Sequence, residues 1–235
     1  MLHLEAVTCA AADPERLAAF WAAVLGREPV GERSGVLLPG SVTQVGLRFV
    51  AEEVPRVAEN PTHLHLTSAE PGDQERTVAR LLALGACRVD VGQRPGEGHI
   101  VLADPEGNPF CVIEHGNAYL ARTGLLGEVA CDGTRAVGEF WSAALGWPLV
   151  WDENDETAIQ SPAGGTKVAW GGLPLLERPG PPRQWFDLVS DDVTVDVARL
   201  EGLGAARAAE TVGGEGHVTL ADPDGVPFRV ASHPG

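Results

Sequence analysis

The first apolar pattern along the chain is that of an amphipathic helix between strands. Large apolar side chains recur at three- and four-residue spacing on one helical face: Leu17, Phe20, Trp21, Val24 and Leu25. Asp13 and Pro14 suit the N-cap and first helical position, and Gly26 suits the C-terminal stop. Short strand-like stretches surround this helix, at Leu4–Cys9, Gly35–Leu38 and Val45–Val50. The pattern predicts a β-α-β-β-β module.

The same order of elements starts again after the first module, and then twice more. A second helix is expected at Asp73–Leu84, which Gly85 ends. Its companion strands are expected at Thr62–Thr67, Arg88–Val91, His99–Ala103 and Phe110–Ile113. In the second half we expect helices at Thr134–Leu145 and Val193–Leu203, and strands at Leu125–Cys131, His217–Leu220 and Phe228–Ala231. The chain therefore contains four predicted modules.

These modules form two copies of one longer repeat. Three pairs of segments match between the halves: Phe20-Trp21 and Phe140-Trp141, Gly96-Glu97-Gly98-His99 and Gly214-Glu215-Gly216-His217, and Asp104-Pro105-Glu106-Gly107 and Asp222-Pro223-Asp224-Gly225. Cys9 also matches Cys131. We expect two domains, at residues 1–116 and 125–235, joined by a linker at residues 117–124.

Composition and charge narrow the class of protein. The 235 residues are 44% hydrophobic, which is enough for one large core or two modest ones. The sequence has no run near the roughly 18 apolar residues of a membrane span and no signal-peptide pattern at its start, so we expect a cytoplasmic protein without a membrane partner. A net charge of −16, with no basic stripe, argues against nucleic-acid binding. Four widely spaced cysteines predict reduced thiols.

Several segments also carry a family resemblance. They are Asp13–Trp21, Leu25-Gly26, His63–Leu66, Leu82–Ala86 and Ala103–Cys111. In this order they resemble the glyoxalase-like branch of the vicinal-oxygen-chelate (VOC) superfamily, which includes glyoxalase I, extradiol dioxygenases and bleomycin-resistance proteins. The resemblance covers nearly the whole chain, twice. It implies an α+β fold of tandem glyoxalase-like domains, in which paired modules curl mixed sheets into a cup, and it implies far less about the reaction.

The resemblance provides a test for a metal site. Metal-dependent members place one His or Glu ligand on the first and last strand of each module. In the first repeat these positions fall on Glu5 or Ala6, residues 44–50, His63 and Cys111. In the second repeat they fall on Gly127 or Glu128, residues 166–172, Trp185 and Arg229. Residues 44–50 contain no His, Asp, Glu or Cys, so one ligand is missing outright.

Neither repeat therefore offers a closed set of imidazole and carboxylate ligands, and Arg229 would repel a divalent cation. We expect no resident metal. If Fe, Mn, Ni or Zn were bound, the expected ligands are Glu5, His63 and Glu114. Glu114 lies three residues beyond Cys111 and hence on the opposite strand face.

Two histidines on one predicted strand are the first candidates for proton-transfer chemistry. His63 and His65 share a strand face, where they form either a two-imidazole clamp with a general base or structural residues bonded to their neighbours. We take His63 as a candidate catalytic residue. For His65, whose equivalent in the second repeat is Asp187, we favour the structural role, with ligand contact as the alternative.

The repeated Gly-Glu-Gly-His segment is the second candidate. It puts Glu97 before His99, and Glu215 before His217, so that a carboxylate could orient an imidazole base. The alternative is a glycine-rich turn with solvated side chains. His99 is carried forward as a catalytic candidate and His217 as a ligand-binding one.

The remaining polar motifs have simpler explanations. In the two Asp-Pro-x-Gly segments, beginning at Asp104 and Asp222, proline and glycine predict a β-turn capped by the aspartate. Cys111 is either a nucleophile facing the cup or a small buried thiol. The sequence shows no adjacent base to activate it, so we favour the buried thiol.

The resemblance implies a VOC-type protein that binds a small molecule in its cups. The expected ligand-binding side chains are Arg48, His65, Cys111, Trp170, Trp185, His217 and Arg229. One hypothesis is sequestration of a natural product, as in bleomycin-resistance proteins. The alternative is a glyoxalase-like lyase or isomerase, or a dioxygenase, in which His63 or His99 shuttles protons. A monomer and a homodimer are both compatible with the tandem repeat.

Overall fold

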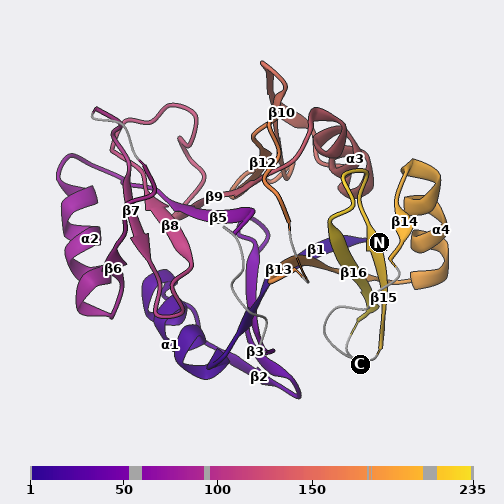
Figure 1. The fold of residues 1–235 in the computed structure, drawn as a ribbon, viewed down its shortest axis with the longest axis horizontal. Coiled ribbons are helices and arrows are strands. Elements are labelled where there is room, and N and C mark those ends of the chain that lie inside the picture. Colours follow the sequence, from indigo (N-terminus) through magenta and orange to yellow (C-terminus); the bar gives the residue numbers. More distant parts are fainter. Residues whose placement is uncertain are drawn as a thin grey trace.

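The computed structural model describes residues 2–52, 60–92, 96–178, 180, 182–208 and 216–233, and its elements form four β-α-β-β-β modules (Figure 1). The first module contains β1 (His3–Ala11), α1 (Pro14–Leu25), β2 (Val30–Glu32), β3 (Gly35–Leu38) and β4 (Gly46–Ala51). The second contains β5 (Thr62–Leu66), α2 (Asp73–Ala83), β6 (Cys87–Arg88), β7 (Ile100–Ala103) and β8 (Pro109–Val112). The third contains β9 (Leu126–Cys131), α3 (Arg135–Leu145), β10 (Leu149–Glu153), β11 (Glu156–Gln160) and β12 (Lys167–Trp170). The fourth contains β13 (Gln184–Ser190), α4 (Val193–Leu203), β14 (Ala206–Arg207), β15 (His217–Ala221) and β16 (Pro227–Ser232).

The predicted helices are confirmed, and their end signals act as expected. The Asp13 side chain accepts a hydrogen bond from the Arg16 amide at 3.0 Å, which caps α1. Gly26 ends the same helix in the left-handed conformation, with φ of 65°. The strand expected at Arg88–Val91 is shorter than predicted, since β6 ends at Arg88.

Two eight-stranded mixed sheets organise the molecule. Their strand orders are β14-β15-β16-β13-β1-β4-β3-β2 and β10-β11-β12-β9-β5-β8-β7-β6. We call them the β1–β13 sheet and the β5–β9 sheet after their central antiparallel pairs. The first sheet joins the first and fourth modules, and the second joins the second and third. The modules therefore pair within one chain, and each sheet takes one module from each repeat (Figure 1).

The helices and aromatic side chains bind the two modules of one repeat together. α1 packs on β3 and β4 of its own sheet, while its Trp21 ring lies edge-on to Phe110 of the other sheet, with ring centroids 5.0 Å apart. The second repeat has the same contact between Trp141 and Phe228, at 4.8 Å. Helix packing thus holds each repeat together, whereas strand pairing joins one repeat to the other.

The Asp-Pro turns are structural, as predicted. Asp104 Oδ1 accepts hydrogen bonds from the Glu106 and Asn108 amides at 3.0 and 2.9 Å, and Oδ2 accepts one from Trp21 Nε1 at 3.2 Å. Asp222 receives the matching bonds in the second repeat. Burial raises the pKa of both carboxyls, that of Asp222 to about 6. Through these hydrogen bonds, each aspartate connects its turn to the tryptophan of the helix packed over it.

One loop from each sheet meets the other at a tight junction. The Thr43 carbonyl accepts a hydrogen bond from the Thr166 amide at 2.9 Å, and Gln44 Nε2 donates to the Thr123 carbonyl at 2.7 Å. Gly165 lies against Thr43 with φ of +92°, and a Cβ atom there would stand 1.6 Å from the Thr43 oxygen. Only glycine fits this approach without a shift of backbone.

The described helices and the cysteines bear on two further expectations from the sequence, which concern membrane spans and disulfide bonds. No helix in the described part of the chain is long and apolar enough to cross a membrane. The four cysteines are free thiols, as predicted: Cys9, Cys87, Cys111 and Cys131.

Candidate functional site

Four polar side chains form a row across the concave face of the β5–β9 sheet. His65 on β5 is in register with Cys111 on β8 and with Glu128 on β9, and Glu128 is in register with Lys167 on β12. Side chains that are in register on neighbouring strands point to the same face. The other face carries the core residues Leu64, Leu66, Phe110, Val112, Val129 and Val168. We call Cys111, His65, Glu128 and Lys167 the polar row.

Hydrogen bonds connect the row to the linker between the repeats. His65 Nδ1 lies 2.8 Å from Glu128 Oε2, and the Tyr119 hydroxyl donates to Glu128 Oε1 at 2.6 Å. Lys167 Nζ donates to the Tyr119 carbonyl at 2.5 Å and lies 3.8 Å from the centroid of that ring. Glu128 is thus a buried carboxylate shared by a histidine and a tyrosine.

Contacts within and beside the polar row shift the pKa values of His65 and Tyr119. Burial lowers the pKa of His65, but hydrogen bonds to Cys111 and Glu128 outweigh burial and raise it to about 10. Burial raises the pKa of Tyr119, and the Glu128 and Glu156 charges raise it further. At neutral pH His65 is therefore an imidazolium and Tyr119 a neutral phenol.

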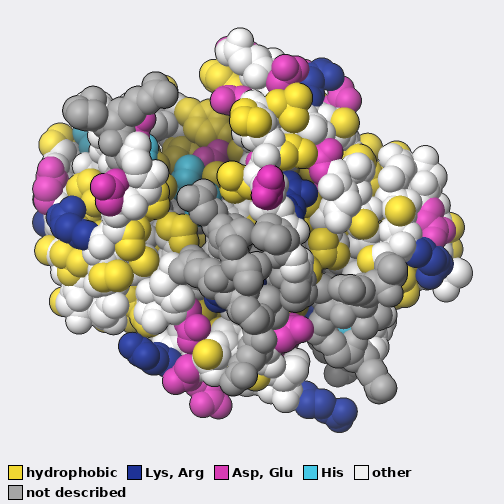
Figure 2. Space-filling view, in the orientation of Figure 1, with side chains coloured by type: hydrophobic (Ala, Val, Ile, Leu, Met, Phe, Trp, Pro, Cys, Tyr) yellow, Lys and Arg dark blue, Asp and Glu magenta, His cyan; other side chains and the backbone are white. Residues whose placement is uncertain are grey.

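A cavity of about 350 Å³ opens beside Glu128. Its lining residues are Tyr119, Glu128, Ala130, Cys131, Trp151, Glu156, Thr157, Ala169, Trp170 and Gly171. Tyr119 and Trp151 meet edge to face with centroids 5.6 Å apart, and Trp151 is 37% exposed. Figure 2 shows a hollow in the upper middle of the view, with hydrophobic, histidine and acidic side chains at its walls. We call this cavity the Tyr119 pocket.

The corresponding face of the β1–β13 sheet is occupied by an ion-pair network. Arg48 donates to Asp187, Glu5 and Glu32 at 2.5, 2.6 and 2.8 Å. Arg229 forms a two-pronged contact with Asp187, through Nε to Oδ1 at 2.5 Å and through Nη2 to Oδ2. Burial alone would raise the pKa of Asp187, but Arg229 and Arg48 outweigh it and hold the pKa below its usual range.

The predicted site residues divide between these two faces. Glu5, Arg48, Asp187 and Arg229 form the network on the β1–β13 sheet. Trp185 lies there too, with the Arg229 guanidinium 5.0 Å from its ring, and His217 is on the neighbouring β15. Glu215 lies outside the described residues.

The concave face of the β5–β9 sheet holds the other candidates. His63 and His65 are on β5, and Cys111 is on β8. His99 directly precedes β7, and its Nε2 is 3.8 Å from Glu97 Oε2. The candidates chosen from the sequence thus fall into two groups, one on the β1–β13 sheet and one on the β5–β9 sheet.

Two placements correct the sequence-based expectations. Trp170, expected among the ligand-binding side chains of the cup, belongs to the hydrophobic core with 2% exposure and is also one of the residues that line the Tyr119 pocket, so its contact with a ligand stays a prediction. Val168 and Trp170 face the core while Lys167 and Ala169 are in register with the concave-face residues of β9. The expectation was one residue out of phase along β12.

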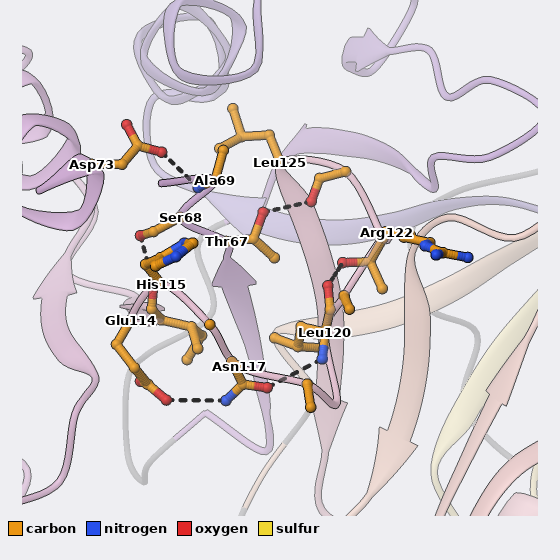
Figure 3. A pocket seen from close by; sticks show the side chains of 16 residues that line it. Thr67, Ser68, Ala69, Asp73, Glu114, His115, Asn117, Leu120, Arg122 and Leu125 are labelled. Carbon is orange, nitrogen blue, oxygen red and sulfur yellow. Dashed lines mark hydrogen bonds between the residues drawn. The ribbon is translucent and has the colours of Figure 1, made fainter. Parts of the chain in front are cut away.

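The alternative metal set is also wrong, because its three members do not meet. Glu5 is on the β1–β13 sheet and His63 on the β5–β9 sheet. Glu114 lines a separate surface hollow of about 530 Å³, which the linker forms together with residues that follow β5 and β8 (Figure 3). There Asn117 Nδ2 donates to Glu114 Oε1 at 3.1 Å, and Asn117 Oδ1 accepts from the Leu120 amide, so these bonds shape the linker itself.

The family model for the glyoxalase-like domain matches the chain twice, at residues 6–113 and 128–231. The chain belongs to the glyoxalase-like family of the VOC superfamily. Each match covers one repeat, so the tandem arrangement expected from the sequence is confirmed.

Solved structures share this fold across the whole glyoxalase-like chain. Glyoxalase I from Zea mays is 13% identical, with a TM-score of 0.66, over 99% of this chain and 92% of that one. A putative dioxygenase from Bacillus subtilis is 15% identical, with a TM-score of 0.64, over 99% of this chain and 85% of that one. No match was found among curated proteins. At such identities the likeness shows the fold alone.

The donor set of this glyoxalase-like protein does not fit the metal site of its metal-dependent relatives. First and last strands of paired modules supply the polar row, in which Lys167 offers an ammonium group without a lone pair. Glu128 already accepts hydrogen bonds from His65 and Tyr119. Within the described residues, no three His, Cys, Asp or Glu side chains are grouped to hold a metal ion.

Sequence reasoning missed three participants of the site. Tyr119 lies in the expected linker, Lys167 carried no motif, and Glu128 was considered only as a metal position. What identifies Lys167 and Glu128 as site residues is their register with His65 across neighbouring strands, and this register depends on how the modules pair. A single sequence does not specify that pairing.

Proposed function

We propose that this VOC protein binds a small planar organic cation in the Tyr119 pocket. A volume of about 350 Å³ suits a compact ligand, since small-molecule sites commonly span about 300–1,000 Å³. The observation that carries the proposal is the combination of two aromatic rings, Tyr119 and Trp151, with two carboxylates, Glu128 and Glu156, around one cavity. Lys167 lies over the Tyr119 ring and His65 is bonded to Glu128, so Trp151 and Glu156 are the ring and the carboxylate that favour a flat cation.

Glu156 is the carboxylate most open to a ligand. Glu128 is bonded to Tyr119 and His65, whereas Glu156 is exposed and forms no ion pair within the described part of the chain. The net charge of −16 would steer a cation toward the protein. Sequestration of a cationic natural product is one function that such a pocket supports.

The test is calorimetric titration with aromatic amidinium and quaternary ammonium compounds. At least one should bind saturably, and Glu156→Gln and Trp151→Leu should each weaken it by about two- to fivefold, through loss of a charge contact and of a cation–π contact. Glu75→Gln on the outer face of α2 removes the same charge at an exposed site and should leave affinity unchanged. If no compound binds, or if all three variants behave alike, the proposal fails.

A second candidate function is proton transfer by a lyase or isomerase, and the His65–Glu128 pair is the observation that favours it. His65, as an imidazolium, would deliver the proton. His65→Gln should then abolish turnover of any substrate found while leaving calorimetric affinity of planar cations within about twofold, because His65 does not line the Tyr119 pocket. Equal turnover by this variant and wild type would exclude His65 from the chemistry.

A further inference from the structure

Cys111 has an imidazole neighbour that comes from another strand. β5 and β8 run parallel, and their register sets His65 directly beside Cys111. The two side chains therefore point to the same face of the sheet, and the interaction with Cys111 is one of the causes that raise the pKa of His65. The sequence around Cys111 shows no such group, because it lies on the neighbouring strand.

Glu128 completes the arrangement from the other side of the ring. His65 Nδ1 is 2.8 Å from Glu128 Oε2, so the second ring nitrogen is the one available for the thiol. Tyr119 holds the other carboxylate oxygen at 2.6 Å. A thiol beside an imidazole that a carboxylate orients is the arrangement that activates cysteine nucleophiles.

The other three thiols lack this environment. Burial raises the pKa of Cys9 and of Cys131 to about 12, which suppresses their thiolates. Cys87 on β6 is exposed, and in the described part of the chain it has no hydrogen-bonded base. Cys111 alone among the four combines partial exposure with a neighbouring imidazole.

We propose that Cys111 is a nucleophile that captures a soft carbon electrophile, an alkene conjugated to a carbonyl group, entering the cup of the β5–β9 sheet. The His65 imidazolium activates the sulfur and supplies the proton that the product needs, and Glu128 is a positioning residue. The proposal rests on the proposed function only in that the same cup admits a small molecule.

The capture is a conjugate addition that balances without a co-reactant. The Cys111 thiol loses its proton to water, and Sγ, beside the His65 imidazolium, forms a bond to the β-carbon of the alkene. The π electrons of the C=C bond move toward the carbonyl group, the α-carbon takes a proton from His65, and His65 recovers a proton from water. The net change is addition of S–H across the double bond, so no oxidant or reductant takes part.

The experiment measures acrylamide modification of all four cysteines in one sample of native protein. Peptide mass spectrometry gives a rate constant for each thiol. Cys111 should react at least about tenfold faster than Cys87 although it is less exposed, because the positively charged His65 side chain lies beside its sulfur. Cys9 is buried and should stay unmodified, so it reports an intact fold.

Two variants separate activation from access. His65→Gln and Glu128→Gln should each bring the Cys111 rate to that of Cys87 or below it, with the Cys87 rate unchanged. Modification of the buried Cys9 in a variant would reveal unfolding, and the wild-type ratio of Cys111 to Cys87 then decides alone. A wild-type ratio of one or less, or a folded His65→Gln variant with an unchanged Cys111 rate, would overturn the proposal.

The two proposals fail separately. Cys111→Ala should abolish fast acrylamide capture and leave calorimetric binding of planar cations unchanged, because Cys111 is not among the residues of the Tyr119 pocket. Fast Cys111 capture without any cation binding would reject only the proposed cation site. Cation binding with a slow Cys111 would reject only the nucleophile.

Discussion

Replacement of Asp187 by alanine is expected to lower the free energy of unfolding by about 3–5 kcal/mol. Asp187 is 4% exposed and pairs with the guanidinium groups of Arg48 and Arg229. Its removal leaves Arg229 without its two-pronged partner and Arg48 with two carboxylates instead of three. Urea unfolding followed by tryptophan fluorescence measures the change.

Asp152→Ala is the matched control. It removes a carboxylate paired with Arg135 on the surface, where an ion pair contributes little, so the unfolding midpoint should barely move. Equal effects of the two substitutions would show that burial of the Asp187 network does not matter to stability.

The Asp187 effect also has a defined pH dependence. Because the pKa of Asp187 is lower in the folded protein than in the unfolded chain, its ionisation stabilises the fold above the unfolded value, about 3.9. This contribution is lost as the pH falls through the folded pKa. The difference between wild type and Asp187→Ala should therefore be full near neutral pH and shrink below about pH 4.

Gly165→Ala is expected to destabilise the protein by more than about 3 kcal/mol. The new Cβ would stand 1.6 Å from the Thr43 carbonyl oxygen, at a backbone φ of +92° that disfavours any L side chain. The loops of both sheets would have to separate, with loss of the Thr166-to-Thr43 hydrogen bond. Thermal and urea unfolding would record the change.

The adjacent Gly164 provides the control. Its φ is +81°, but nothing lies within 4 Å of a Cβ there, so Gly164→Ala should cost only the backbone term of about 1–2 kcal/mol. If both alanine variants lose the same stability, the close contact with Thr43 contributes nothing.

Local sequence signals predicted the modules well because their physics is local. An N-cap at Asp13, a stop at Gly26 and apolar side chains at helical spacing fix α1 whatever surrounds it. The Asp-Pro turn at Asp104 is equally self-contained, since its carboxylate caps amides within four residues. Such local features do not depend on how the modules pack against one another.

The site was harder to predict because it depends on cross-strand register. His63 was preferred to His65 because Asp187 is the equivalent of His65 in the second repeat, yet the register places His65 between Cys111 and Glu128. Trp170 was assigned to the wrong face by a phase error of one residue, which in a strand reverses every side chain. The sequence does not contain the distances that decide these roles.

The pairing of the first module with the fourth, and of the second with the third, has an evolutionary consequence. Two separate copies of one repeat, related by a twofold axis, would build two identical cups, because each cup would take the leading module of one copy and the trailing module of the other. Every substitution would then appear in both cups at once. Covalent fusion removes that symmetry, so one cup was free to fill with Arg48, Asp187 and Arg229 while the other kept an open cavity beside Glu128.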